Sequence, residues 1–303
     1  MPQLDFDPFL LLDSVLLPIA LGLIMFGIGL GLRPDDFRRV INGRRAFVIG
    51  MGSMLVFVPG VGIALALAFG PTPELTIGLI LLATCPSGIL SNALTDIAEG
   101  DIALSVSIST GLSLTYLVSL PIVLSFLASG DLVSGSGAGP PFGPTMLKIV
   151  LFTLVPVSLG MLARALFPSL ADRPRTAIKR AATAFLMGLF VLLMLREREV
   201  LADAFGTLFA LIIAMNVANL LIAFTVSWLG RLRRDERTAI TIEHLMRQEG
   251  TAIFVAVTLL GSPAMAVPMI VNTLIGMAAT AIVIARFCYA NRASGSALAG
   301  QAR

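Results

Sequence analysis

Long apolar segments separated by short charged loops recur along the whole sequence, and they constrain the fold more than any other feature. Hydrophobic residues make up 57% of the chain and charged residues only 13%, which is about half the charged share of an average soluble domain. An apolar helix of about 20 residues crosses a bilayer core of about 30 Å. The sequence therefore predicts an all-α polytopic membrane protein.

We expect about nine membrane-spanning helices. Their predicted ranges are 14–32, 46–70, 75–98, 102–129, 145–167, 177–195, 203–229, 238–260 and 264–287. Residues 1–13 contain no Lys or Arg, so they lack the basic start of a signal peptide, and we expect the first helix to belong to the mature protein. Because nine is odd, the two termini should lie on opposite sides of the membrane.

The basic residues indicate which side is cytoplasmic. With nine spans, seventeen of the 21 Lys and Arg residues fall on one side, whereas the other side receives only Lys148, Arg196 and Arg198. Arg247 falls inside the membrane. Cytoplasmic loops carry an excess of basic residues, so we expect an inner (plasma) membrane protein with an external amino terminus and a cytoplasmic carboxyl terminus. An eight- or ten-span count would destroy this asymmetry.

Two of the predicted helices carry polar interruptions near their middle. CPSG (85–88) divides the third segment and RQEG (247–250) divides the eighth, leaving halves too short to cross a membrane alone. Interrupted helices at matching positions in the two halves of a chain indicate an inverted-repeat transporter, with its site where the breaks cross. A simple kink at Pro and Gly is the alternative interpretation.

Glu243 is the most informative single residue. A carboxylate at the middle of a membrane costs about 3 kcal/mol or more on insertion scales, which favours a bound cation or proton as its partner. An ion pair with Arg247, four residues further along the same helix, is the structural alternative.

Neutral oxygens accompany this carboxylate. Ser91 and Asn92 follow the first break, and Ser105 and Ser109 lie four residues apart on one face of the next predicted helix. Such serines usually bond to carbonyls of their own helix. Together with Glu243, however, they form a set of hard oxygen ligands that suits a hard cation such as sodium.

Other residue types point away from enzymes and nucleic acids. We find no nucleophile and base pair and no metal motif of recognisable spacing, so we do not expect an enzyme. The basic clusters are short and spread over several loops, which argues against nucleic-acid binding. His244, the single histidine, is either a packed hydrogen-bonding group or a proton carrier.

Several motifs resemble the bile acid:sodium symporter family, including its bacterial members. These are LGLIMFGIGLGLRPDDF (21–37), CPSGILSN, GDIALSVSIST and TIEHLM, and the resemblance runs from about residue 20 to 287. It implies an inverted repeat in which a core domain with two crossed discontinuous helices moves against a panel domain, and sodium-coupled uptake of organic anions. Bacterial relatives often have ten helices, whereas this chain starts too late to include the first of them. It therefore resembles a nine-helix variant of the family.

The resemblance also implies how the chain divides. A single transmembrane domain would cover residues 1–303, with panel helices at about 14–32, 145–167 and 177–195. The core would contain the other six predicted helices, at about 46–70, 75–98, 102–129, 203–229, 238–260 and 264–287.

The family's first sodium site maps onto this chain, whereas its second does not. The first site would comprise Ser91, Asn92, Ser105, Ser109 and Glu243. At the second site, two glutamines of relatives align with Met54 and Arg247, and a guanidinium has no lone pair for a metal. We therefore expect Arg247 to replace the second sodium, with Glu249 as its candidate partner. Crossover positions that read substrate in relatives become Ile89 and Gln248, and His244 lies in the same stretch.

The leading hypothesis is a sodium-coupled symporter of a small organic anion that works by alternating access with one sodium ion, in a lipid bilayer. One alternative is a proton-coupled or uncoupled carrier in which Glu243 or His244 titrates. Another is a membrane sensor of the same fold that binds but does not transport.

Overall fold

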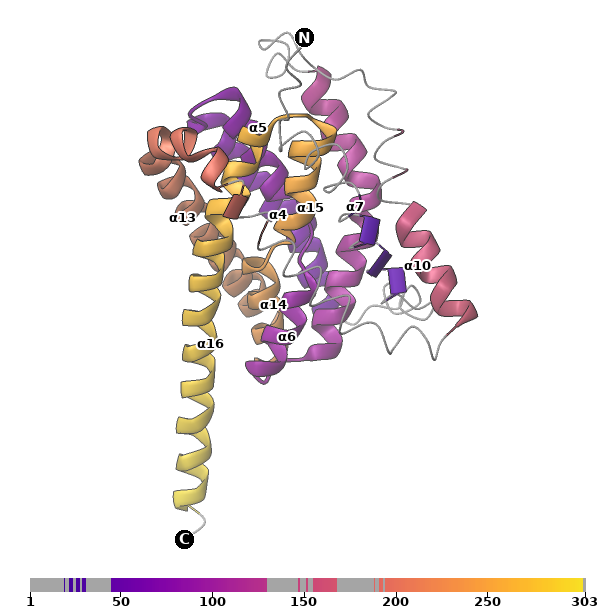
Figure 1. The fold of residues 1–303 in the computed structure, drawn as a ribbon. Coiled ribbons are helices and arrows are strands. Elements are labelled where there is room, and N and C mark those ends of the chain that lie inside the picture. Colours follow the sequence, from indigo (N-terminus) through magenta and orange to yellow (C-terminus); the bar gives the residue numbers. More distant parts are fainter. Residues whose placement is uncertain are drawn as a thin grey trace, which may run out of the picture.

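The computed structural model describes residues 45–129, 155–167 and 194–301, with isolated positions between 19 and 30 and between 147 and 192. Every regular element in these ranges is helical (Figure 1), which confirms the predicted all-α class. Most of the predicted spans 14–32 and 177–195, and part of 145–167, lie outside the described residues. The count of nine helices and the division into panel and core therefore stay predictions.

Long apolar helices make the chain a polytopic membrane protein. Helix α4 (Arg45–Phe69), helix α13 (Arg198–Leu229) and the segment Pro263–Phe287, which includes the start of α16 (Val267–Gln301), are long and apolar enough to cross a membrane. Helix α7 (Ile102–Ser129) joins them if its two parts, which bend by 47° next to residue 117, count as one span. Pro121 accounts for the bend, because it has no N–H to donate to the carbonyl four residues before it.

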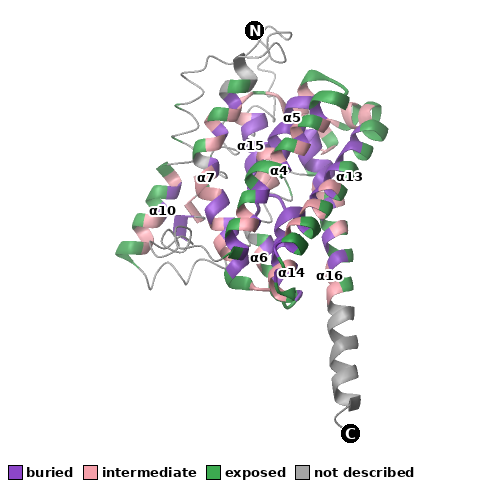
Figure 2. Cartoon of the chain, turned by 180° about the vertical axis from the view of Figure 1, so that it is seen from behind, coloured by how far each residue is buried: buried purple, intermediate pink, exposed green. Residues whose placement is uncertain are grey.

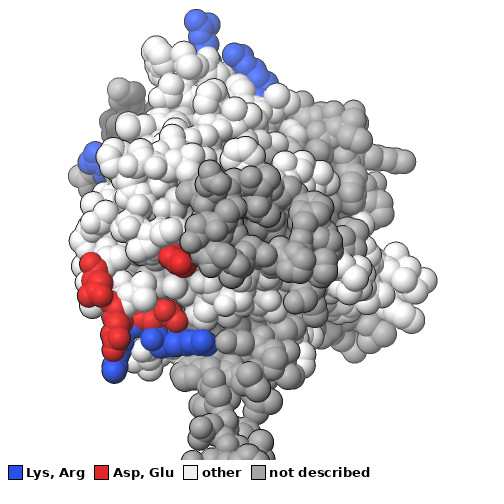
Figure 3. Space-filling model, turned by 90° about the horizontal axis from the view of Figure 1, so that it is seen from above, with Lys and Arg blue, Asp and Glu red and all other residues white. Residues whose placement is uncertain are grey.

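The outer surface of the described helices is apolar. Val118, Ile122 and Phe126 on α7, and Phe224 and Trp228 on α13, are all exposed, and exposed positions follow the outward faces of both helices in Figure 2. Figure 3 looks down on the end near the amino terminus, where most of the described surface is uncharged and the few charged side chains lie mainly toward its upper and lower-left edges. A surface this apolar suits contact with lipid.

The third predicted span is broken where the sequence indicated. Helix α5 (Pro73–Thr84) begins at Thr72, whose Oγ1 accepts a hydrogen bond of 3.3 Å from the Leu75 N–H, and Pro73 occupies the first turn. The helix ends because Cys85 precedes Pro86, and a residue before proline is disfavoured in the helical region; Cys85 is extended, with ψ 148°. The chain becomes helical again in α6 (Ile89–Ile97).

The eighth predicted span is broken as well. Helix α14 (Arg234–Leu245) ends at Met246, which is extended, and α15 (Glu249–Phe254) starts three residues later and runs into a π-helical turn (Val255–Leu259). The Gln248 N–H donates a hydrogen bond of 2.9 Å to the Pro86 carbonyl. The two interruptions, residues 85–88 and 246–248, are therefore in contact, and we call this region the crossover.

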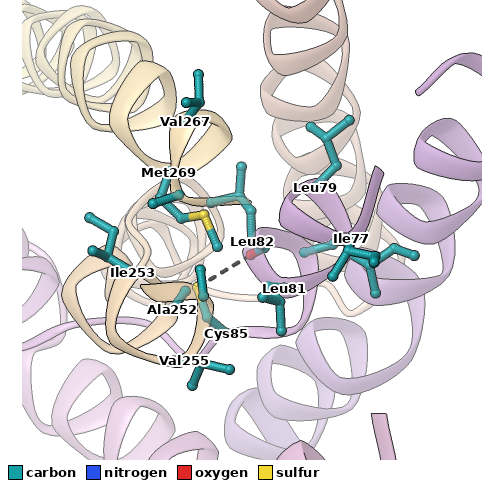
Figure 4. Close-up of a cluster of buried hydrophobic side chains, with 14 of the residues drawn as sticks. Ile77, Leu79, Leu81, Leu82, Cys85, Ala252, Ile253, Val255, Val267 and Met269 are labelled. Atoms are coloured by element: carbon teal, nitrogen blue, oxygen red, sulfur yellow. Dashed lines mark hydrogen bonds between the residues drawn. The ribbon is translucent and has the colours of Figure 1, made fainter. Parts of the chain in front are cut away.

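An apolar layer supports the crossover from one side. Figure 4 shows side chains of α5, α15 and α16 gathered around Cys85, and the Cys85 thiol donates to the Leu82 carbonyl at 3.2 Å. Leu82, Ile253 and Met269 are all buried there. These contacts fix α5 and α15 relative to each other, although neither helix is long enough to be stable alone.

Close packing of α4 against α5 yields a stability prediction. A Cβ at Gly62 would overlap the Ala83 Cβ and lie 3.1 Å from the Met215 Cε, whereas a Cβ at Gly60 on the same helix would meet nothing within 4 Å. We expect Gly62→Ala to destabilise the protein by about 1–3 kcal/mol through overpacking. Gly60→Ala, the matched control, should be neutral or stabilise it by up to about 1 kcal/mol. Melting temperatures of the purified protein in detergent test this, and equal shifts in the two variants would contradict it.

Candidate functional site

Five polar side chains from three helices meet beside the crossover, and we call them the oxygen cluster. They are Ser91 and Asn92 of α6, Ser105 and Ser109 of α7, and Glu243 of α14. Helix α7 follows α6 after a short turn, and α14 contacts both of them. Glu243 has 0% exposure although it carries an ionisable group.

Hydrogen bonds connect all five members of the oxygen cluster. Glu243 Oε1 lies 2.7 Å from Ser91 Oγ and 2.5 Å from Ser105 Oγ, and each hydroxyl can donate to it. Ser105 Oγ is also 2.7 Å from Asn92 Oδ1, and Asn92 Nδ2 donates to Ser109 Oγ at 3.2 Å. The structure thus brings together the five residues that the sequence analysis assigned to one sodium site; their role as ligands stays a prediction.

The oxygen cluster has more acceptor atoms than protons to share. Ser105 has a single hydroxyl proton but lies at hydrogen-bond distance from two oxygens that only accept, on Glu243 and Asn92. Ser91 has the same difficulty, because its Oγ is 2.6 Å from the Gly88 carbonyl and 2.7 Å from Glu243 Oε1. Hydrogen bonding alone leaves lone pairs facing one another, and a cation placed among them would relieve this excess.

Two further side chains belong to this region but were missed from the sequence. The Ser87 hydroxyl is buried beside the Glu243 carboxylate, and neither Ser87 Oγ nor Glu243 Oε2 has a hydrogen-bond partner among the described residues. Thr95 Oγ1 donates to Ser105 Oγ at 3.3 Å. Ser87 could have been predicted from its place inside CPSG, whereas Thr95 carries no comparable signal.

Arg247 lies in the crossover and is buried, with 6% exposure. Its Nη1 donates a hydrogen bond of 3.1 Å to the Cys85 carbonyl, which links the two breaks a second time. Its Nη2 has no partner, and no ion pair shorter than 4 Å joins Arg247 to a carboxylate in the described part of the chain. The expected alternative, an ion pair with Glu243, is therefore not formed in this structure.

Glu249 is bonded to an asparagine and not to Arg247. Its Oε1 accepts a hydrogen bond of 2.9 Å from Asn272 Nδ2 on α16. The Asn272 Oδ1 in turn accepts one of 2.8 Å from Asn216 Nδ2 on α13. Both asparagines are buried, Asn216 near the middle of α13 and Asn272 in the second turn of α16, and such polar residues are rare in membranes. Their position within apolar segments is a signal that the sequence analysis did not use.

Met54 on α4 and His244 on α14 are two further candidate residues from the sequence. Met54, with 2% exposure, packs into an apolar cluster of α4, α7 and α14 that includes Ile108 and Ile240. His244 Nδ1 donates to the Ile240 carbonyl at 2.8 Å, and its Nε2 lies 3.0 Å from Ser53 Oγ on α4.

Two candidate crossover positions lie at the starts of the second half-helices. Ile89 is the first residue of α6, and Gln248 directly precedes α15 and is partly buried. The Gln248 N–H donates to the carbonyl of Pro86, which lies three residues before Ile89. The two breaks therefore place these positions at one point of the fold.

Comparison with known proteins identifies the family. The sequence profile described as "Sodium Bile acid symporter family" matches residues 18–204. The uncharacterized sodium-dependent transporter YocS of Bacillus subtilis (strain 168) is 28% identical over 255 residues, which cover 84% of this chain and 77% of the relative. The probable chloroplastic sodium/metabolite cotransporter BASS2 of Oryza sativa subsp. japonica is 29% identical over 265 residues, or 86% of this chain and 61% of that protein.

A mammalian relative matches a shorter stretch. The ileal sodium/bile acid cotransporter of Oryctolagus cuniculus is 31% identical over 173 residues, which cover 56% of this chain and about half, 49%, of the relative. The family profile spans more than half of this sequence and includes the first broken span and the four oxygen-cluster residues of α6 and α7. The chain belongs to the sodium bile acid symporter family.

Proposed function

We propose that this protein is a sodium-coupled secondary transporter of a small organic anion, a symporter that binds one sodium ion in the oxygen cluster. Family membership supports the reaction class, since the relatives are named as sodium-dependent transporters or cotransporters. The proposal of transport, not catalysis, rests on this family membership.

The excess of acceptors around Glu243 Oε1 is the observation that carries the proposal. Sodium binds neutral and anionic oxygens without needing protons from them, so an ion could use the Ser91 and Ser105 hydroxyls, the Asn92 carbonyl and the carboxylate together. Ser109 would complete the set through Asn92. Glu243 is buried and forms no ion pair with the described residues, so the ion would balance its negative charge.

Arg247 replaces a second sodium ion in this proposal. Met54 offers only a thioether and sits among apolar side chains, so α4 supplies no hard oxygen at that position. The guanidinium donates a hydrogen bond to the Cys85 carbonyl, a backbone group of the crossover. Its Nη2, which has no partner among the described residues, is the group that would bind a carboxylate of the substrate. Gln248 and Ile89 would border the substrate at the same place.

A proton-coupled carrier is the second candidate. One proton on Glu243 would also reduce the excess of acceptors in the oxygen cluster, because it adds a donor where two hydroxyls compete. His244 is less suited to this role, since both of its ring nitrogens already have partners on α4 and α14. Replacing sodium with potassium at constant pH separates the two candidates, because only the sodium symporter loses uptake into proteoliposomes.

Two serines of α7 provide a matched test of sodium binding. Ser105 Oγ contacts Glu243, whereas the Ser107 hydroxyl bonds only to the Ala103 carbonyl of its own helix. We expect Ser105→Ala to weaken the apparent sodium affinity about tenfold or more, because a ligand oxygen is lost. Ser107→Ala should leave the affinity within about twofold. Sodium titrations followed by thermal stabilisation in detergent provide the measurement, and equal affinities in the two variants would contradict the assignment.

Restoring the two glutamines tests the role of Arg247. In the double variant Arg247→Gln, Met54→Gln, amide oxygens replace the guanidinium and the thioether, so a second ion could bind. We expect the Hill coefficient of sodium binding, measured by thermal stabilisation in detergent without substrate, to rise from about one toward two. Met54→Gln alone serves as the control and should leave it near one, since the guanidinium remains. A coefficient that stays near one in the double variant counts against the replacement of an ion by Arg247.

A further inference from the structure

The crossover holds opposite charges that do not neutralise each other directly. Arg247 and Glu249 are two residues apart, one on each side of Gln248, yet no ion pair shorter than 4 Å joins them in the described part of the chain. The guanidinium is buried, it donates a hydrogen bond to the Cys85 carbonyl through Nη1, and its Nη2 has no partner among the residues that the structure describes. A buried donor without a partner is costly unless a ligand satisfies it.

A chain of amides keeps Glu249 away from the arginine. Asn272 Nδ2 donates to Glu249 Oε1 at 2.9 Å, Asn216 Nδ2 donates to Asn272 Oδ1 at 2.8 Å, and the same Asn216 nitrogen is 2.9 Å from the Ile212 carbonyl. This chain anchors the carboxylate to α16 and α13. Glu249 itself is only partly buried, unlike Glu243.

The balance of charge restricts what else can bind here. With Glu243, Arg247 and Glu249 in their ionised forms, the three side chains would together carry one net negative charge, which a single sodium ion in the oxygen cluster would neutralise. A substrate with one net negative charge would then leave the region charged in a medium of low dielectric constant, where that is costly. A substrate that carries a carboxylate and a cationic group adds no net charge.

We propose that the substrate is a small zwitterion whose carboxylate binds the Arg247 guanidinium and whose ammonium group binds the Glu249 carboxylate. This inference rests on the sodium coupling proposed above, and it changes the proposed substrate from a simple organic anion to a carboxylate that also carries an ammonium group. Arg247 recognises the anionic part of the substrate. Glu249 selects for a cationic group elsewhere on the same molecule, and Asn272 and Asn216 act as positioning residues for Glu249.

Pairs of compounds that differ only in the ammonium group test the proposal. Suitable pairs are valine with isovalerate, glycine with acetate, β-alanine with propionate, and γ-aminobutyrate with butyrate. Binding to the full-length protein in detergent is measured by thermal shift in sodium buffer. We expect at least one amino acid to bind about tenfold or more tightly than its anionic counterpart, because the anion leaves Glu249 unpaired. If no zwitterion of the series binds more tightly than its counterpart, the proposal is wrong.

Variants at position 249 identify the residue responsible. Glu249→Gln should abolish or reverse the preference for the zwitterion, whereas Glu249→Asp should retain it. Glu199→Gln, an exposed carboxylate in the first turn of α13, serves as the control and should change nothing. A preference that survives in Glu249→Gln would overturn the role of Glu249. Stabilisation by sodium alone, measured in the same samples, reports on the oxygen cluster separately, so the two proposals can fail independently.

Discussion

Burial of the Glu243 carboxylate is the main constraint on this structure, because a carboxylate that is removed from water must find partners within the protein. Glu243 has no exposure and no ion pair among the described residues, and two hydroxyls compete to donate to one of its oxygens. Side chains of three helices supply these partners: α6 provides Ser91 and Asn92 just after the first break, α7 provides Ser105 and Ser109, and α14 brings the carboxylate to them. The breaks themselves release backbone groups, which are tolerated in a membrane only where they are buried in protein.

The crossover and the apolar layer hold this arrangement in place. A backbone hydrogen bond between Gln248 and Pro86, and the bond from Arg247 to the Cys85 carbonyl, satisfy groups that the breaks release. On the other side, α5, α15 and α16 bury a layer of apolar side chains around Cys85 (Figure 4). Polar groups that would be unstable in a membrane thus lie between protein surfaces and not against lipid.

Much of this could be predicted from the sequence, because its signals are local. The predicted spans 46–70 and 102–129 differ from α4 and α7 by at most one residue, and Pro and Gly marked the breaks that end α5 and begin α6. The five oxygen-cluster residues were grouped from their spacing and from the family resemblance. Contacts between distant helices carry no local pattern: the sequence did not predict Asn272 as the partner of Glu249, Ser53 beside His244, or Ser87 beside Glu243.

Sodium-coupled transport by this protein requires that a sodium ion binds in the oxygen cluster. Isothermal titration of sodium into the purified protein, without substrate and at constant pH, measures this directly. We expect about one sodium ion to bind per chain, and potassium to give no comparable heat. In Glu243→Gln we expect no sodium binding, because the amide removes the charge that balances the ion. Sodium binding of undiminished affinity in Glu243→Gln, or no sodium binding in the unmodified protein, would contradict a sodium site in the oxygen cluster.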